Sequence, residues 1–300
     1  MYDRILVPLD GTAFSEQAIG TAIAVARRSS GAIFLATVEV PPPATLLRVG
    51  IEGAARSAMA DYLDRTAERV SAESIAVSTA VLKGPAADML ERHRNDVGAT
   101  LTVMATHGRG PAARAWLGSV TDQFVRWTTA PTLLVRPEEN DAPVALDATP
   151  SIDRILVTLD GSALSEAALT PALELARLFD SALSVTRLVV YPNTPESVYL
   201  PDATTAIEAK LEKGRAAAER ELVAISDRLR AEGVEVRTVC RVARHAAEGI
   251  LEVADDEKAN VIAMATHGRG GVGRLLLGSV TDKVLRATDR TMLIVHPSMD

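Results

Sequence analysis

The chain has 300 residues, 47% hydrophobic and only 3% aromatic, so we expect two compact cores built mainly from Ala, Val, Leu and Ile. Its net charge of −7 argues against a general affinity for nucleic acid, whose phosphates would be repelled. It has no apolar run long enough to span a membrane, and its one cysteine, Cys240, fits a reducing cytoplasm.

The first half alternates short apolar runs with helical patterns. Residues 4–9 are rich in Ile, Leu and Val, as expected of a buried parallel strand, and a helix is predicted after the turn at Asp10-Gly11-Thr12. Pro85 is expected to open a later helix, because proline is tolerated in the first helical turn. Further strands are predicted at 32–38, 76–82, 101–104 and 132–135, and further helices at about 53–70 and from Ser119 to about Trp127.

The second half repeats this order. Strands are predicted near 154–159, 183–189, 235–242, 260–265 and 291–295. Strands that alternate with helices indicate a parallel sheet covered on both faces. The predicted fold class is therefore α/β, with two tandem, open, doubly wound five-stranded parallel sheets of Rossmann-like type. The domains are expected at 1–137 and 152–300, joined by a polar, proline-bearing linker at 138–151.

A glycine-rich cassette occurs once in each half. Met104 to Gly110 reads M-A-T-H-G-R-G and is followed by L-G-S-V-T-D, and the same two segments return from Met264. Nine residues separate Gly108 from Gly118, and nine separate Gly268 from Gly278. A repeat one domain long indicates a duplication. Because the spacing is kept twice, we expect both halves to retain the same pocket.

The residue types in the cassette suit a phosphate group. Ligands of an open parallel sheet lie beyond the carboxyl ends of strands, and both Asp10 and the Gly108 loop follow strand ends. Gly118-Ser119 lies where a helix begins, and a helix N-terminus offers unpaired N–H groups and the positive end of a dipole. The hydroxyls of Ser119 and Thr121 can add hydrogen bonds, and Asp10 can accept one from a ribose hydroxyl.

Each feature also has a purely structural interpretation. Ser119-x-x-Asp122 matches a capping box, which is the favoured reading of that segment taken alone. Asp10-Gly11 alone is an ordinary turn between a strand and a helix. His107 and His267 are expected to orient their loops, and no metal site made of protein ligands is predicted. The joint occurrence of these features in both halves favours ligand binding.

The cassettes resemble those of the nucleotide-binding branch of the universal stress protein family, over nearly the whole chain. That branch carries G-x-x-G-x9-G-[ST], and here Gly108, Gly118 and Ser119 match, as do Gly268, Gly278 and Ser279. The first glycine of the pattern is Ala105 in one half and Ala265 in the other. The added methyl group would either crowd the ligand or be harmless where the backbone keeps a negative φ.

The resemblance implies that each half binds ATP, with Mg²⁺ accompanying the phosphates. The adenine and ribose contacts would come from the ends of the first two strands, and the phosphate contacts from the cassette. In the first half these residues are Pro8, Leu9, Asp10, Val38, Met104, Ala105, Gly108, Arg109, Gly118, Ser119, Val120 and Thr121. In the second half they are Thr158, Leu159, Asp160, Leu188, Met264, Ala265, Gly268, Arg269, Gly278, Ser279, Val280 and Thr281.

The two glycine loops differ in composition. The second loop has Gly271 and Gly273 where the first has Pro111 and Ala113, so the second loop should adapt more easily. On this ground alone, the second site is expected to bind at least as tightly as the first.

Three functions remain open from the sequence. The leading one is a regulatory ATP-binding stress-response protein that senses or signals adenine nucleotide state, with little or no hydrolysis, since no catalytic residue is well placed. The second is a protein-interaction module of the same fold that does not depend on nucleotide. The third is a slow ATP-hydrolysing or nucleotidyl-transferring enzyme. The turn at Leu9 to Thr12 disfavours this third function, because that class displays a Ser-Gly-Gly-x-Asp-Ser loop at this place.

The resemblance also implies that the domains pair through their last strands, around Leu133–Val135 and Leu293–Val295. A tandem chain can make that pair internally, and homodimerisation of the chain is left open. The expected partners are adenine nucleotide and unidentified proteins, with neither nucleic acid nor a membrane. The first residues lack a basic segment followed by an apolar run, so no signal peptide is expected.

Overall fold

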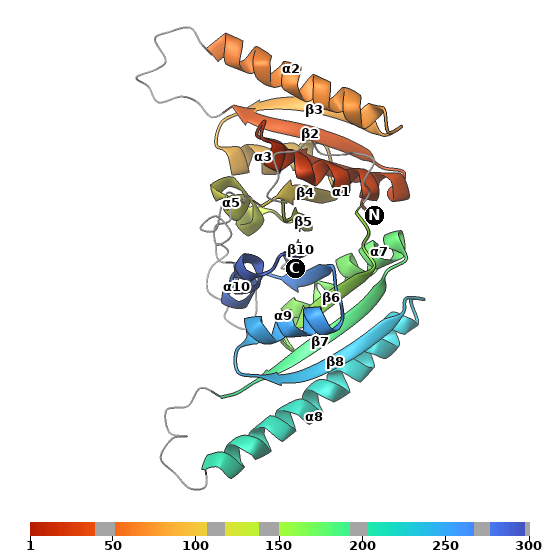
Figure 1. Ribbon diagram of the computed structural model, residues 1–300, viewed down its shortest axis with the longest axis vertical. Helices are drawn as coiled ribbons and strands as arrows, with labels where there is room; N and C mark the ends of the chain where they lie inside the picture. The colour runs from red at the N-terminus through yellow and green to blue at the C-terminus, as the bar shows by residue number, and fades with distance from the viewer. Residues whose placement is uncertain (40–51, 107–117, 138–149, 193–202, 267–276, 298–300) are drawn as a thin grey trace. The chain divides into compact units, whose positions relative to one another are not determined.

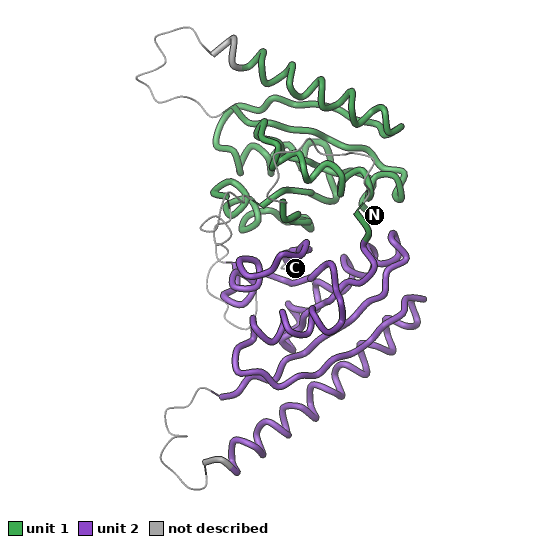
Figure 2. Tube along the Cα trace, in the orientation of Figure 1, with its two compact units in different colours: residues 1–151 green, residues 152–300 purple. Residues whose placement is uncertain are grey.

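The computed structural model describes residues 1–39, 52–106, 118–137, 150–192, 203–266 and 277–297 (Figure 1). The chain divides into two compact units, Met1–Ser151 and Ile152–Asp300 (Figure 2). Most of the predicted linker, 138–149, lies outside the described residues. Among those that are described, no helix combines the length and the apolar character needed to cross a membrane.

The first unit is an α/β domain with a five-stranded parallel sheet, as predicted. The strand order is β3-β2-β1-β4-β5, so the order reverses between β1 and β4. Its elements are β1 (Arg4–Pro8), α1 (Ala13–Ser29), β2 (Ala32–Glu39), α2 (Glu52–Ser71), β3 (Ala76–Lys83), α3 (Ala86–Asp96), β4 (Leu101–Ala105), α5 (Ser119–Trp127) and β5 (Thr132–Val135). Right-handed crossovers place α1 and α2 on one face of the sheet, and α3 and α5 on the other.

The second unit repeats this topology, with the order β8-β7-β6-β9-β10 and all described pairs parallel. Its strands are β6 (Arg154–Leu159), β7 (Ala182–Val190), β8 (Val236–Ala243), β9 (Val261–Ala265) and β10 (Thr291–Val295). Its helices are α6 (Ala163–Glu166), α7 (Leu169–Phe179), α8 (Ala203–Arg230), α9 (Ala246–Asp256) and α10 (Ser279–Ala287). The sequence predicted both sheets and every strand within two residues.

One difference between the units lies in the helix that follows the first strand. In the first unit α1 is continuous, whereas in the second unit the same segment is broken into α6 and α7. Pro171 lies four residues after Ala167, at the break. A proline ring clashes with the carbonyl four residues earlier and has no N–H to donate. Pro171 therefore accounts for the interruption.

The cores are aliphatic, as the composition predicted. Ile5, Leu6 and Val7 of β1 are completely buried, and so are Ile155, Leu156 and Val157 of β6. A parallel strand that is covered by helices on both faces buries consecutive residues, which explains the unbroken apolar runs.

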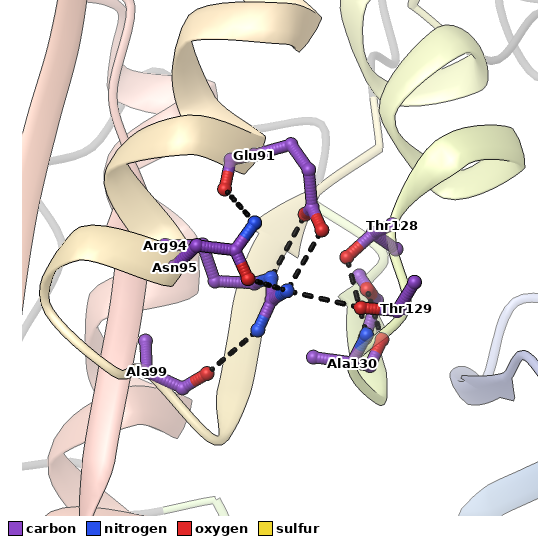
Figure 3. Close-up of polar contacts among 8 residues, drawn as sticks. Glu91, Arg94, Asn95, Ala99, Thr128, Thr129 and Ala130 are labelled. Atoms are coloured by element: carbon purple, nitrogen blue, oxygen red, sulfur yellow. Dashed lines mark hydrogen bonds and ion pairs between the residues drawn. The ribbon is translucent and has the colours of Figure 1, made fainter. Parts of the chain in front are cut away.

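A buried guanidinium fixes the helix that follows the first cassette. Arg94 of α3 donates from Nε and Nη2 to the two carboxylate oxygens of Glu91 at 2.8 and 2.7 Å (Figure 3). It also donates from Nη1 to the Ala99 carbonyl at 3.1 Å and from Nη2 to Thr129 Oγ1 at 3.0 Å. Because Ala99 precedes β4 and Thr129 follows α5, this cluster holds α3, β4 and α5 in one arrangement.

Candidate functional site

Several of the predicted site residues in each half lie at the carboxyl edge of its sheet. In the first unit β1 and β4 are hydrogen-bonded neighbours, with Leu6 opposite Thr102. Pro8 and Ala105 end these two strands at the point where the strand order reverses. In the second unit β6 and β9 make the same pair, with Val157 opposite Ala263. This reversal is where ligands bind in open α/β sheets.

The aspartate that follows the first strand is held in a tight turn. Asp10 Oδ1 accepts hydrogen bonds from Thr12 N at 3.0 Å and from Thr12 Oγ1 at 2.6 Å. Gly11 has a φ of 81°, a left-handed conformation that favours glycine. Thr12 in turn caps α1 by accepting from Ser15 N at 3.2 Å. The exposed Asp10 carboxylate is therefore fixed in orientation at the edge of the sheet.

The second unit reproduces this turn almost atom for atom. Asp160 Oδ1 accepts from Ser162 N at 2.8 Å and from Ser162 Oγ at 2.6 Å, and Gly161 has a φ of 78°. Ser162 caps α6 by accepting from Ser165 N at 3.1 Å. Asp160 is therefore placed and oriented as Asp10 is.

The helix α5 begins without a side-chain cap. Its N-cap residue is Gly118, which has no side-chain cap hydrogen bond among the described residues, and Ser119 is the exposed first residue of the helix. The capping-box prediction for Ser119 and Asp122 is therefore wrong. The Asp122 carboxylate instead pairs with Arg126, one turn further along, at 2.9 and 2.8 Å. Within the described part of the chain, the start of α5 is therefore not capped by a side chain.

The helix α10 begins in the same way. Gly278 is its N-cap residue, without a side-chain cap, and Asp282 pairs with Arg286 at 2.9 Å. The two glycine-capped helices contrast with α1 and α6, which are capped by a hydroxyl. The helices α3, α7 and α9 also lack a side-chain cap hydrogen bond, so α5 and α10 are distinguished among the described N-caps by having a glycine there.

The threonine of each cassette is used inside the protein. Thr121 is 2% exposed, and its Oγ1 donates to the Ala105 carbonyl at 3.4 Å. Thr281, 3% exposed, donates to the Ala265 carbonyl at 3.3 Å. These bonds tie the start of each helix to the end of the preceding strand. A phosphate contact by either hydroxyl stays a prediction.

The two alanines that replace a motif glycine occupy extended backbone. Ala105 and Ala265 are the last residues of β4 and β9, and neither has a positive φ. An alanine is therefore unstrained at these places, and the backbone does not require the missing glycine.

Two further predicted contacts lie on the second strand of each half. Val38 is half-buried and pairs with Leu82 of β3, and Leu188 is half-buried and pairs with Arg241 of β8. Other predicted residues are buried or half-buried, namely Leu9, Met104, Val120, Thr158, Leu159, Met264 and Val280. Gly108, Arg109, Gly268 and Arg269 lie outside the described residues, as do His107 and His267.

A polar group near Asp10 was not predicted. Tyr62 of α2 donates from its hydroxyl to Glu16 Oε1 at 3.1 Å, and Arg69 pairs with the other oxygen of Glu16 at 2.7 Å. Burial, reinforced by the neighbouring Glu16 carboxylate, raises the pKa of Tyr62 well above its ordinary value. Tyr62 therefore stays protonated and acts as a hydrogen-bond donor.

The second unit has an ion pair at the corresponding place. Arg228 of α8 pairs with Glu166 at 2.8 Å, as Arg69 pairs with Glu16 in the first unit. When the two units are aligned on these ion pairs, Glu221 of α8 is the residue equivalent to Tyr62, because each lies seven residues before its arginine. Glu221 Oε2 accepts from Arg187 Nη1 of β7 at 2.9 Å. The sequence signal that could have revealed this ion pair is Arg187, a charged residue within an otherwise largely apolar strand.

No group of three His, Cys, Asp or Glu side chains within the described ranges is arranged to hold a metal ion. Any Mg²⁺ at these sites would therefore have to be bound largely by the ligand's phosphates and by water.

Comparison with known proteins gives a consistent result. The model of the Universal stress protein family matches residues 1–136 and again residues 151–296. A universal stress protein of Mycobacterium tuberculosis is 30% identical over 203 residues, which cover 67% of this chain. The match spans 63% of that relative, less than two thirds of its length. A universal stress protein of Thermus aquaticus is 32% identical over 149 residues, covering 47% of this chain and 97% of that protein.

Among solved structures, a universal stress protein from Archaeoglobus fulgidus has a TM-score of 0.72 at 16% identity, covering 99% of this chain and 97% of that one. A protein from Pseudomonas aeruginosa has a TM-score of 0.67 at 18% identity, covering 99% of this chain and 93% of that one. At these identities, the likeness shows a shared fold.

Proposed function

The chain belongs to the universal stress protein family, and on that premise we propose that it binds ATP and signals adenine nucleotide state. The observation that carries the proposal is the glycine-capped start of α5 and α10. In both units this helix follows the strand at which the strand order reverses. The N–H groups of a first helical turn and the positive end of the helix dipole favour a phosphate group.

The turn after the first strand supports a nucleoside at the same edge. Asp10 and Asp160 are exposed carboxylates held in one orientation, and such a group can accept a hydrogen bond from a ribose hydroxyl. The phosphates would lie at Ser119 and Ser279, beside the helix N-termini. Mg²⁺, when bound with the triphosphate, would neutralise part of the phosphate charge.

Fast hydrolysis is not expected of this arrangement. Phosphoryl transfer needs a residue that positions the attacking water and a concentration of positive charge. Oδ1 of Asp10 already accepts two hydrogen bonds from Thr12, and Asp160 is bound in the same way by Ser162. These bonds engage each carboxylate within its own turn rather than with an attacking water. We therefore propose a regulatory role, with ATP consumed slowly if at all.

The proposal is tested by placing a negative charge where the phosphate should lie. Nucleotide-stripped protein is titrated with Mg-ATP by calorimetry, and Ser119→Asp with Ser279→Asp is compared with Ser119→Asn with Ser279→Asn. Aspartate at a helix start stabilises the helix by about 0.3–1 kcal/mol, so loss of binding would not reflect unfolding. Two like charges 4 Å apart repel by about 4 kcal/mol at an effective dielectric constant of 20.

We expect saturable binding by the wild type, a loss of at least about tenfold with the aspartates, and a loss of less than about threefold with the asparagines. Equal affinities of the Asp and Asn variants would contradict a phosphate at the helix starts. No heat with ATP, ADP or AMP in any variant would favour the nucleotide-independent interaction module. Turnover of about 1–100 s⁻¹, as in ordinary kinases, would favour an enzyme.

A further inference from the structure

The two units differ in the space above the turn that follows the first strand. Gly11 and Gly161 have nearly the same φ, 81° and 78°. A Cβ atom added at Gly11 would meet no described atom within 4 Å. A Cβ atom added at Gly161 would overlap the guanidinium of Arg187. No described atom therefore fills the space next to Asp10, whereas the space next to Asp160 is filled by a side chain.

The guanidinium of Arg187 is held in this place from two sides. Arg187 belongs to β7, where it pairs with Leu159 at the end of β6. Its Nη1 lies 2.9 Å from Glu221 Oε2 on α8, and the two side chains are only 16% and 31% exposed. Among the described residues, its Nε is buried without a hydrogen-bond partner. The strand and the helix together fix Arg187 over Gly161.

The first unit has a threonine, not an arginine, at the corresponding strand position. Thr37 stands where β7 has Arg187, 150 residues later, and it is 5% exposed. Tyr62 stands where α8 has Glu221, and its hydroxyl is turned to Glu16. With a short side chain on the strand and a tyrosine on the helix, the space over Gly11 is not filled by any side chain that the structure describes.

The charge of Arg187 adds little attraction for a nucleotide. The guanidinium is already neutralised by Glu221 at 2.9 Å, so the pair presents little net charge. A nucleoside that needs this space must move Arg187 away from Glu221. Separating a largely buried ion pair leaves two poorly solvated charges, which is unfavourable.

We propose that Arg187 and Glu221 obstruct the nucleoside end of the second pocket, so that the first unit is the tighter nucleotide site. This inference rests on the proposed function, since it assigns different affinities to the two sites of that function. It is the reverse of the expectation from loop composition, because the filled space near Gly161 outweighs a more adaptable glycine loop.

The test exchanges the two residue pairs between the units. Arg187→Thr with Glu221→Tyr gives the second unit the residues of the first, and Thr37→Arg with Tyr62→Glu does the reverse. Each exchange is combined with Ser119→Asp or Ser279→Asp, so that one site is measured at a time by calorimetry with Mg-ATP. Thermal melting by circular dichroism checks that every variant is folded. Arg187→Gln serves as a second, smaller change if the double exchange does not fold.

We expect the wild-type second site to bind at least about tenfold more weakly than the first. Arg187→Thr with Glu221→Tyr should remove most of this difference, and the reverse exchange should weaken the first site. Two wild-type sites of equal affinity, or a second site unchanged by the exchange and by Arg187→Gln, would overturn the inference and leave the proposed function intact. No binding of ATP, ADP or AMP by any variant would overturn both.

Discussion

Removing the guanidinium of Arg94 should destabilise the first unit strongly. The Arg94 side chain is 9% exposed, and Glu91, which it binds with two hydrogen bonds, is 18% exposed. Arg94→Met keeps the apolar stem of the side chain but leaves the Glu91 carboxylate and the Ala99 carbonyl without this donor. Losing one partner of a buried ion pair costs about 3–5 kcal/mol. Because Glu91 is partly exposed, we expect the lower end, about 3 kcal/mol.

Urea unfolding monitored by tryptophan emission measures this change in the first unit alone. Both tryptophans of the chain, Trp116 and Trp127, lie within Met1–Ser151. For a urea dependence of about 2 kcal/mol per molar, a loss of 3 kcal/mol lowers the unfolding midpoint by about 1.5 M. Arg94→Lys keeps the charge but cannot serve both Glu91 oxygens and the carbonyl, so it should lose about half as much.

The second unit provides a matched control. Arg290 donates to the Ala259 carbonyl at 2.7 Å and pairs with Asp255 at 2.5 Å. The Ala259 carbonyl is the counterpart in the second unit of the Ala99 carbonyl that Arg94 binds. Arg290→Met should therefore leave the tryptophan transition unchanged. Adding Glu91→Gln to Arg94→Met should restore part of the lost stability, because no uncompensated carboxylate remains. A midpoint shift below about 0.3 M for Arg94→Met, or an equal shift for Arg94→Lys, would refute this reasoning.

Three further predictions concern single residues. A Cβ atom at Gly278 would lie 2.7 Å from the Thr266 carbonyl oxygen. Gly278→Ala should therefore lower the melting temperature of the nucleotide-free protein, measured by circular dichroism. An unchanged melting temperature would contradict the close approach. Burial raises the pKa of the Cys240 thiol, so iodoacetamide at pH 7.5 should alkylate it more slowly in the folded protein than in urea, and equal rates would argue against the shift. Burial lowers the pKa of His93 from its ordinary value near 6.5, so the unfolded chain binds the proton first and the first unit loses stability as pH falls below about 6.5. Tryptophan-monitored unfolding between about pH 7 and 5 should show this loss of stability in the wild type and a smaller loss in His93→Gln. An equal loss in both proteins would mean that other groups cause it.

The sequence predicted the strands closely because both faces of each central strand are buried. Such strands read as unbroken apolar runs, and β4 and β9 are predicted to within one residue. Helix starts were less predictable. Pro85 was expected inside the first turn of a helix, but it is the extended N-cap residue of α3. Both positions suit a proline, so local sequence does not separate them.

The capping-box error has the same origin. A serine at the N-cap and a serine one residue later give the same local pattern, and only the backbone angles of Gly118 decide between them. Contacts between side chains that are distant in sequence could not be predicted, for a different reason. Arg187 and Glu221 are 34 residues apart, and Tyr62 and Glu16 are 46 apart. Their contacts depend on how a helix is seated on the sheet, which no local pattern encodes.

The differences between the two units are of two kinds. A backbone carbonyl accepts from any donor that reaches it, so the Ala99 carbonyl can be served from α3 and the Ala259 carbonyl from the turn before β10. Exchanging the donor leaves the fold unchanged. The space over Gly11, which no described atom fills, is different, because the proposed nucleotide would need room there. Since the backbone of the two turns is nearly the same, any difference in nucleotide affinity that the residue exchange removes must come from Arg187 and Glu221.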